Sequence, residues 1–538
     1  FLSDDYYAGF TPFAWRGRGL FLPEYALSRL VETPTEILAI IDTFLADPNL
    51  TATTGLVTGY DFLSDQAQGI DAQLTAAGMT VTSLINDHWT AAELENLWLN
   101  NRHDLNAINA HFGHFEAIPA ETSGGVVTPA EVAATPIDQA GSLVFSVGCH
   151  SGFSAPDHQA TANGLDFPQA LLGRGVTYIA NTGYGYGDAD TVGYSELLMT
   201  LFVEQLCQSS NIGQALRQAK LAYFNRISLH SLSPYDEKVL AEATLYGLPM
   251  YGVELPICPN MTDVASSSNG RSLLVSITDD LATRKVVFTP TFTAHAVANG
   301  KYFSVLGETE SNPGQPIQPR TSLDVSHPGT VARGAVFEGG RYQTFDSFDP
   351  VVTRVITEDS DLPLWQAEPP FAFDRWVPAS WSLINSIRTA DGLQQRLVVM
   401  PAHYRALDEQ IGIERLFDEM TYTVYYANSE DRTPPSIWAV RNLPGIGEFT
   451  IEVEATDFAG VRRVVVAYNT GDGIWLTVDM TQSPNDEDFW TTTLPLKPTV
   501  EYFVQVVDEV GNVAVSNNKG RYFVTPYTYY FPVFFLGR

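Results

Sequence analysis

The chain has 538 residues, of which 45% are hydrophobic and 17% charged, a composition typical of globular rather than disordered proteins. Its 62 acidic residues outnumber the 30 basic ones and give a formal net charge of −32, so its surface repels the phosphates of nucleic acids and of anionic membranes. This excludes nucleic-acid binding as a main activity. The length exceeds what a single hydrophobic core serves and predicts about three domains.

The chain contains three cysteines, Cys149, Cys207 and Cys258, too few for a disulfide framework. Cys207 and Cys258 either pair in an oxidising compartment or remain two buried thiols, and the sequence leaves both open. The chain begins at Phe1 without a signal-like segment, which favours a processed form. No apolar run approaches the roughly 20 residues that a membrane-spanning helix needs, so we expect no membrane span.

Residues 1–255 alternate helix and strand signals. Thr33, Pro34 and Glu36 form a capping box with proline at the first helical position, and Thr90 and Glu93 form a second one. The hydrophobic pattern predicts strands at 55–61, 80–85, 105–114, 142–148 and 176–180, and helices at 64–78, 90–100, 167–172, 194–207 and 211–224. This alternation predicts a doubly wound, mostly parallel α/β sheet.

From residue 256 onward, short alternating strands and turn residues replace the helices. They predict a β-sandwich over residues 256–432, and a second β-sandwich over residues 433–525 after the linker Asp431-Arg-Thr-Pro-Pro. The strands predicted in the second sandwich are 448–455, 462–468, 475–479, 489–493 and 501–507. Residues 526–538 form an aromatic tail, which we expect to pack on a neighbour or to contact a partner or surface.

A cysteine and a histidine stand where two predicted strands end. The strand at 142–148 is apolar and bounded by glycine, as in the centre of a parallel sheet, and leads into Cys149. The run at 105–114 ends on His114. Because ligands bind at the carboxyl ends of parallel strands, adjacent strands would bring both side chains to one edge. A thiol beside an imidazole is what a cysteine nucleophile and its base require.

His114 is therefore the candidate base, and the backbone amides of Phe115 and Cys149 are candidate donors to an oxyanion. His111 and His150 compete for the role of base. Strand alternation puts His111 and His114 on opposite faces, and it turns His150 away from Cys149. The alternative interpretation is that these cysteine and histidine side chains are only packed in the interior.

At this point the residues match a known family. An apolar strand ending Gly-His and a later one ending Gly-Cys resemble the caspase-like clan of cysteine peptidases, and within it the chain is similar to the gingipain family. Residues 113–115 correspond to that family's Gly-His-Gly block and residues 146–153 to its nucleophile block, with a similar interval of 35 residues between His114 and Cys149. The resemblance also includes residues 27–30, 178–182 and 245–249, so it covers about residues 1–255.

Carried over residue by residue, the resemblance implies Cys149 as the nucleophile and His114 as general base and acid. It implies an acidic residue that orients the histidine, for which Asp61 is the candidate. The family often carries an immunoglobulin-like domain after the peptidase domain, similar to residues 433–525. It also implies an extracellular or cell-surface location.

The resemblance further implies where substrate binds. The wall of the primary specificity pocket would come from the loop after Thr182, with Tyr184, Tyr186 and Asp188. In arginine-specific relatives an acidic residue on the loop after the first strand meets the substrate guanidinium, and Asp65 or Asp71 would suit that contact. Both of these carboxylates equally fit the solvated face of an amphipathic helix.

Two positions depart from the family pattern. Phe115 stands where the family has the glycine after the histidine, and Gly247-Leu-Pro replaces its closing Gly-Asp-Pro. Such changes imply an altered specificity or a scaffold that has lost its activity.

The first hypothesis is therefore a secreted cysteine endopeptidase that hydrolyses peptide bonds of protein substrates through a thioester. This chemistry requires no cofactor. The family implies structural calcium, for which the acidic runs 188–190 and 486–488 are candidates, although the sequence does not assign the metal ligands. The alternative hypothesis is a catalytically inactive extracellular scaffold that assembles through the β-domains and the tail. A third is carbohydrate adhesion through residues 256–432.

Overall fold

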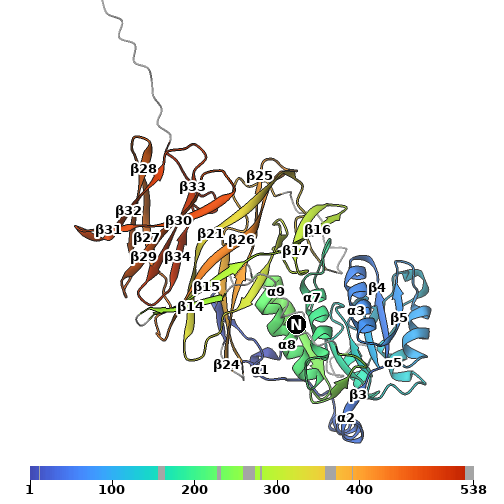
Figure 1. Cartoon of the computed structure of the whole chain (residues 1–538). Helices are drawn as coiled ribbons and strands as arrows, with labels where there is room; N and C mark the ends of the chain where they lie inside the picture. The colour runs from blue at the N-terminus through green and yellow to red at the C-terminus, as the bar shows by residue number, and fades with distance from the viewer. Residues whose placement is uncertain are drawn as a thin grey trace, which may run out of the picture.

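The computed structural model describes residues 1–10, 12–154, 164–226, 232–258, 273–278, 281–357, 371–389 and 392–526. An α/β part comes first along the chain, and a β-rich remainder follows it (Figure 1). This order agrees with the expected α/β region followed by all-β regions. The predicted aromatic tail lies outside the described residues from Tyr527 onward.

A six-stranded sheet forms the centre of the α/β part, in the order β12-β10-β9-β6-β4-β5. All neighbours are parallel except β12, which runs antiparallel to β10 at one edge. Buried on both faces, β6 and β9 carry the continuous apolar runs seen in the sequence. The six strands are β4 (Thr54–Gly59), β5 (Thr80–Ile85), β6 (Leu105–Ile108), β9 (Leu143–Phe145), β10 (Thr177–Asn181) and β12 (Ala243–Tyr246).

Helices cover both faces of this sheet. One core includes Val57, Phe145 and Ile179 and packs against α3 (Ser64–Ala76), α7 (Tyr194–Leu206), α8 (Ile212–Arg226) and α9 (Pro234–Glu242). The opposite core includes Leu56 and Val144 and packs against α2 (Pro34–Ala46), α4 (Ala91–Leu94), α5 (Pro129–Ala134) and α6 (Phe167–Leu172). Among the described residues, no helix combines the length and the apolar character that a membrane span requires.

The starts of several helices follow local sequence signals. The two predicted capping boxes are present, at α2 and α4. The sequence analysis missed α5 and α9, although both begin with the same reciprocal cap, at Thr128 and Ser233. The helix predicted at 90–100 leaves the α-helical form after α4 and continues as a π-helical turn over Glu95–Leu99.

The run predicted as one strand at 105–114 is divided in two. After β6 the chain forms a separate hairpin of β7 (His111–Gly113) and β8 (Glu116–Ile118), and His114 and Phe115 are its two-residue turn. His114 therefore sits at a hairpin tip rather than at the end of a sheet strand. The physical reason is the burial of Phe112, whose ring packs on Phe167 beneath the hairpin.

The β-rich remainder contains a ten-stranded sheet that joins the two predicted β regions. The long strands β21 (Val331–Phe348) and β26 (Gly412–Ala427) come from the first region, and β21 pairs with β30 (Ile474–Asp479) of the second. β30 continues the sheet into β29 (Val461–Asn469) and β33 (Glu501–Asp508). The two regions are thus linked by strand pairing as well as by the chain.

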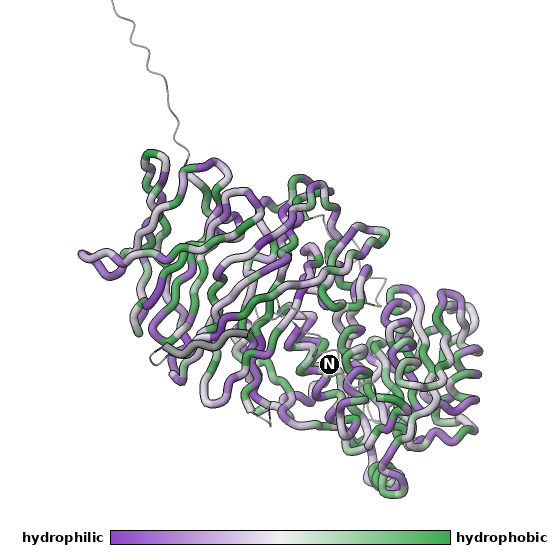
Figure 2. Tube along the Cα trace, in the orientation of Figure 1, coloured by the Kyte–Doolittle hydropathy of each residue, from purple (hydrophilic) through white to green (hydrophobic). Residues whose placement is uncertain are grey.

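A second sheet covers one face of β29 and β33. It contains β27 (Ser436–Pro444), β28 (Glu448–Thr456), β32 (Asp486–Pro495) and β31 (Thr481–Ser483). β28 buries every second residue, and Figure 2 shows hydrophobic and hydrophilic residues alternating along the strands of this part. The five strands predicted between residues 448 and 507 are all present, as β28, β29, β30, β32 and β33.

Cys207, which follows α7, and Cys258 form a disulfide with their Cα atoms 5.2 Å apart. This resolves the alternative that the sequence left open. Cys149 is the cysteine outside the disulfide.

The disulfide spans 51 residues. In the chain-entropy model, closing a loop of this length stabilises the folded state by up to about 4 kcal/mol. We expect the double variant Cys207→Ser/Cys258→Ser to lower the Tm by roughly 5–10 °C in scanning calorimetry. Cys149→Ser leaves the loop closed and is the control. An unchanged Tm in the double variant would contradict the stabilising role.

Candidate active site

Cys149 lies just beyond the carboxyl end of β9, at the edge of the parallel sheet. The residue is buried, with 3% of its surface exposed. Its Sγ accepts a hydrogen bond from the Gly185 amide at 3.2 Å and lies 3.7 Å from the Gly185 carbonyl oxygen. Gly185 belongs to the segment that follows β10. The sulfur therefore lies between the backbones that leave two neighbouring strands, β9 and β10.

Two glycines allow these backbones to approach. A Cβ on Gly148 would lie 2.3 Å from the ring of Phe112 and 2.8 Å from the Ala110 carbonyl oxygen. A Cβ on Gly185 would lie 2.0 Å from the carbonyl oxygen of Val147. Real Cβ atoms do not come this close, so both positions require glycine.

The ring of His114 packs against the loop that carries Cys149. It stacks on the ring of His150 with centroids 4.5 Å apart and an angle of 18° between the planes. The ring of Phe153 meets it edge-on at 4.9 Å. Because His150 directly follows Cys149, the hairpin tip and the cysteine loop form one surface at this edge.

His150 is held by its backbone. It adopts a left-handed conformation with φ of 57°, and its amide donates to the Gly183 carbonyl oxygen at 2.6 Å. His111 lies elsewhere, with its ring against those of Tyr60 at 5.0 Å and Phe62 at 5.9 Å. Of the three histidines considered as a base, the structure brings His114 and His150 to the cysteine loop.

Burial sets the protonation of these two rings. Burial lowers the pKa of His114 below its usual range, because the charged form loses solvation. Burial also lowers the pKa of His150, and the neighbouring His114 adds to this effect. Both imidazoles are therefore neutral at pH 7, the form in which an imidazole can accept a proton from a thiol.

The three residues predicted as a pocket wall point in different directions. Tyr184 is 39% exposed, and its ring meets that of His150 at 4.6 Å, so it faces the site. Tyr186 is buried, and its hydroxyl accepts a hydrogen bond from Lys238 Nζ at 2.8 Å. Asp188 is buried with 1% of its surface exposed and faces the β-rich part of the chain. Of the three, only Tyr184 exposes its ring at this edge.

The three predicted carboxylates, Asp61, Asp65 and Asp71, also lie in different places. The exposed Asp61 follows β4, and its amide donates to Asp87 Oδ1 at 2.8 Å. Within the described ranges, no hydrogen bond or ion pair links Asp61 to His114. Asp65 is the second residue of α3, at the same edge of the sheet. Asp71 accepts hydrogen bonds from Ser83 and Thr75 and so ties α3 to β5.

Sequence reasoning missed Glu242, a buried carboxylate at this edge. It precedes the antiparallel strand β12, so it lies beside the carboxyl end of β10, and its carboxylate carbon would be 2.6 Å from a Cβ on Gly183. Burial raises its pKa to about 8, opposed by Lys238. Its Oε2 has no hydrogen-bond partner in the described part of the chain. The capping box at Ser233 could have predicted α9, but only the direction of β12 brings Glu242 here.

A surface hollow of about 490 Å³ opens beside His114. Apolar side chains form much of its wall, and the hairpin tip forms one rim. Its lining residues are Gly113, His114, Phe115, Glu116, Thr128, Pro129, Ala130 and Leu165.

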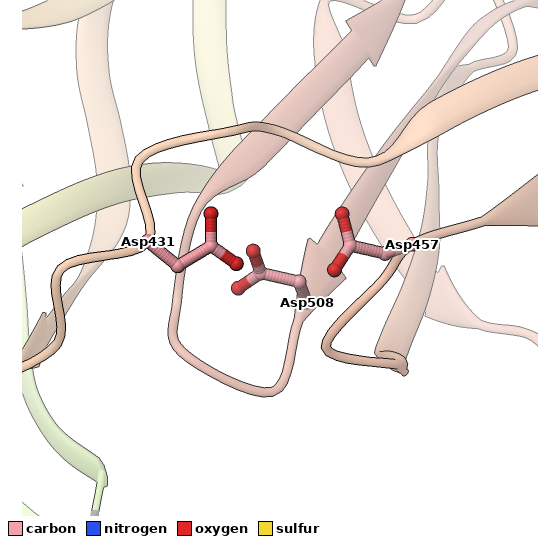
Figure 3. A group of neighbouring side chains, drawn as sticks. All are labelled: Asp431, Asp457 and Asp508. Carbon is pink, nitrogen blue, oxygen red and sulfur yellow. The ribbon is translucent and has the colours of Figure 1, made fainter.

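Three carboxylates converge at a second place, in the C-terminal β region. Asp431, Asp457 and Asp508 each offer an oxygen within 4.8 Å of the others (Figure 3). They come from the linker, the turn after β28 and the end of β33. Burial raises the pKa of Asp508, and the nearby Asp457 adds to this effect. Oxygen donors in this arrangement suit a calcium ion.

The acidic runs that the sequence analysis favoured for calcium are arranged differently. Asp188 Oδ1 accepts from the amides of Asp190 and Thr191. Asp486 and Asp488 lie on β32, and the Asp488 amide donates to the Asp486 carboxylate. Neither run forms a cluster of three ligands among the residues that the structure describes.

No protein-family model matches the chain, and no curated protein matches it. Among solved structures, the chain is similar to the Arg-specific cysteine proteinase gingipain R (RGPB), with 14% identity and a TM-score of 0.35, over 56% of this chain and 70% of that one. It is also similar to a complex of the pro- and mature domains of RgpB from Porphyromonas gingivalis, with 15% identity and a TM-score of 0.34 over 56% and 71% of the two chains.

A third similar structure concerns the zymogenic latency of gingipain K from Porphyromonas gingivalis, with 15% identity and a TM-score of 0.20, over 30% of this chain and 99% of that one. All three TM-scores lie below 0.5.

The contact between Gly185 and Cys149 can be tested by substitution. Gly185→Ala forces its Cβ against the Val147 carbonyl oxygen and displaces the amide from the sulfur. We expect a Tm several degrees lower and a several-fold change in the rate at which iodoacetamide alkylates Cys149. Gly69→Ala, in α3 with no atom within 4 Å of the added Cβ, is the control and leaves both unchanged or raises the Tm slightly. Equal behaviour of the two variants would contradict the packing argument.

Proposed function

We propose that the protein is a cysteine endopeptidase that cleaves peptide bonds of protein substrates. The observation that carries the proposal is the thiol of Cys149 at the carboxyl edge of a parallel sheet, on a loop against which the His114 ring packs. The Gly185 amide donates to the sulfur, and a donor in this position stabilises the negative charge of a thiolate. A cysteine nucleophile with a neighbouring imidazole needs no cofactor.

In this mechanism the Cys149 thiol gives its proton to the imidazole of His114, and the sulfur attacks the carbonyl carbon of the scissile bond. The tetrahedral intermediate collapses as the C–N bond breaks, and the leaving amine takes the proton from His114. Water then attacks the thioester while His114 accepts one of its protons. The C–S bond then breaks and releases the acid, and the sulfur takes back the proton from His114, which restores the thiol. The amides of Cys149 and Phe115 are the proposed oxyanion donors.

We propose that peptide lies across the edge between the exposed ring of Tyr184 and the hollow beside His114. The apolar wall of that hollow suits a side chain of the substrate near the leaving group, because the proton donor stands at its rim. Asp61 and Asp65, at the same edge of the sheet, remain candidates for orienting the histidine and for meeting a basic side chain.

The location that we propose is outside the cell. The disulfide between Cys207 and Cys258 supports it, since disulfides persist in oxidising compartments.

An inactive extracellular scaffold is the second candidate. The observation in its favour is the 3% exposure of Cys149, because a nucleophile must meet its substrate and this sulfur is covered by the segment after β10. Ordered assembly of the purified protein, together with a complete absence of thiol-dependent proteolysis, would favour the scaffold.

Removal of the thiol or the imidazole tests the peptidase. We expect Cys149→Ala and His114→Ala to lower kcat/KM on an unstructured protein substrate such as casein by at least about 1,000-fold, since each removes a group that the reaction uses. His111→Ala is the matched control, since its ring lies against Tyr60, and it retains activity. Undiminished turnover in Cys149→Ala would exclude the proposal.

The same assay gives a pH dependence. Protonation of His114 removes the base, and burial lowers its pKa, so kcat/KM stays constant above that pKa and falls as the pH drops through it. The midpoint of this acid limb is expected below the ordinary histidine value of about 6.5.

Structural calcium is a further proposal, at Asp431, Asp457 and Asp508. An ion between them would offset the repulsion of three clustered carboxylates and tie the linker to two loops of the C-terminal β region. The oxygens of Asp508 already accept from Asn512 and Val510, which fixes their orientation.

Calcium at millimolar concentration is expected to raise the Tm by several degrees, because an ion that binds only the folded state stabilises it by mass action. Asp457→Asn should remove most of this shift. Asp486→Asn, at an exposed position at the start of β32, is the control and keeps this shift. A Tm that does not respond to calcium would refute the site.

A further inference from the structure

The segment that covers Cys149 is also part of the contact between the α/β part and the β-rich part. Two residues after Gly185 it becomes β11 (Gly187–Asp188), which pairs antiparallel with β22 (Val355–Ile356). Val355 packs against the core of the α/β part. A strand of the β-rich part thus completes a two-stranded sheet with the segment that leaves the active-site edge.

Side chains reinforce this pairing. The Arg354 amide donates to Asp188 Oδ2 at 3.2 Å, and Arg354 Nη2 forms an ion pair with Asp190 Oδ2 at 3.0 Å. Asn299 lies in the turn between β16 (Phe292–Val297) and β17 (Gly300–Val305) and donates to Asp190 Oδ1 at 2.9 Å. Both carboxylates of the segment are therefore held by residues that lie more than 100 positions later in the chain.

The ionisable side chains at this contact are mostly acidic, and burial raises the pKa of Asp188 to about 6 and that of Glu196 well above its ordinary range. The side chains of Asp190 and Arg354 are 6% and 33% exposed, and Asp188 and Glu196 are buried. Glu196 Oε2 accepts from the Asp188 amide at 3.2 Å, which brings a third carboxylate against the segment. In the described part of the chain, Arg354 is the cation that forms an ion pair here. Removing its guanidinium leaves the nearly buried carboxylate of Asp190 without its ion-pair partner.

The segment has an inner attachment as well. The Tyr186 amide donates to Ser195 Oγ at 3.1 Å, and the Ser195 amide donates to the Tyr186 carbonyl oxygen at 2.9 Å. Gly185 lies directly before this attachment and uses both its N–H and its C=O on Cys149 Sγ. Two residues, Tyr186 and Gly187, separate Asp188 from the Gly185 atoms that contact the sulfur.

We propose that Arg354 and Asn299 are positioning residues: through Asp188 and Asp190 they hold the segment from Gly183 to Asp190 over Cys149, so that the β-rich part sets access to the thiol and the position of Tyr184. The effect on catalysis rests on the proposed function. The effect on access to the thiol does not, because it depends only on the covering segment.

The experiment measures alkylation of Cys149 by iodoacetamide in the folded full-length protein, by mass spectrometry over time. Arg354→Ala is expected to alkylate about 3- to 10-fold faster than the wild type, and Arg354→Lys, which keeps the charge, lies between them. Asn299→Ala removes one exposed hydrogen bond without leaving a charge unpaired and should accelerate alkylation about 2-fold. Arg341→Ala, which breaks an exposed ion pair with Asp418, is the matched control and changes nothing.

Rates in Arg354→Ala and Asn299→Ala that equal those of the wild type and of Arg341→Ala would overturn the inference. If Arg354→Ala fails to fold, as judged by a lost cooperative thermal transition, the alkylation rates of Asn299→Ala and Arg354→Lys test the inference instead.

Peptide hydrolysis separates this inference from the proposed function. With an active wild type, Arg354→Ala should raise KM several-fold while kcat changes less than about 2-fold, because the wall of the site moves and the thiol and imidazole remain. A wild type without activity whose alkylation still responds to Arg354→Ala would refute the peptidase and support the positioning role. An active wild type with unchanged KM and alkylation in Arg354→Ala would refute the positioning role alone.

Discussion

The candidate site depends on the close approach of three backbones that leave the same edge of the parallel sheet. Gly148 lets the end of β9 pass against Phe112 of the hairpin, and Gly185 lets the segment after β10 pass against Val147. Neither position has room for a Cβ, so the cost of any side chain there is a displaced backbone. The hydrogen bond from Gly185 to Cys149 exists because this approach is possible.

The direction of the strands then decides which side chains meet. Parallel strands deliver Cys149 and the hairpin of His114 to one edge, as the ligand rule for α/β sheets states. The antiparallel β12 adds the residue that precedes it, and this brings Glu242 to the same edge. The edge therefore combines a thiol, neutral imidazoles and a buried carboxylate whose pKa is raised to about 8. Such an assembly of perturbed groups is typical of functional sites.

The β-rich part forms a strand pair and core contacts with the α/β part. The pairing of β11 with β22 continues the covering segment into a small sheet between the two parts, and Ile387 of β23 (Ser382–Thr389) packs in the α/β core. Figure 1 shows α7, α8 and α9 lying between the parallel sheet and the long strands β21 and β26. Arg354 of the β-rich part forms an ion pair with Asp190 of the α/β part and so adds a charged contact between the two.

The sequence alone determined the order of the parts and many of the regular elements in the α/β part and in residues 448–507. Capping boxes predict the starts of α2 and α4, apolar runs predict the buried strands β6 and β9, and alternation predicts β28 and its neighbours, because these signals are local. The pattern also singled out Cys149 and His114 as neighbours at one edge, and the structure places the ring of His114 on the cysteine loop. The roles of these two residues stay predictions.

Only the tertiary structure decided what surrounds the thiol. Contacts between residues far apart in sequence divide the run at 105–114 into β6 and a hairpin and bury Tyr186 and Asp188. Such contacts also bring Glu242 to the edge of the sheet and Arg354 to Asp190. A local sequence pattern does not predict such contacts, because the same residues could pack equally well against other neighbours. The pairing of Cys207 with Cys258 was left open by the sequence for that reason, and the fold settles it by bringing their Cα atoms to 5.2 Å.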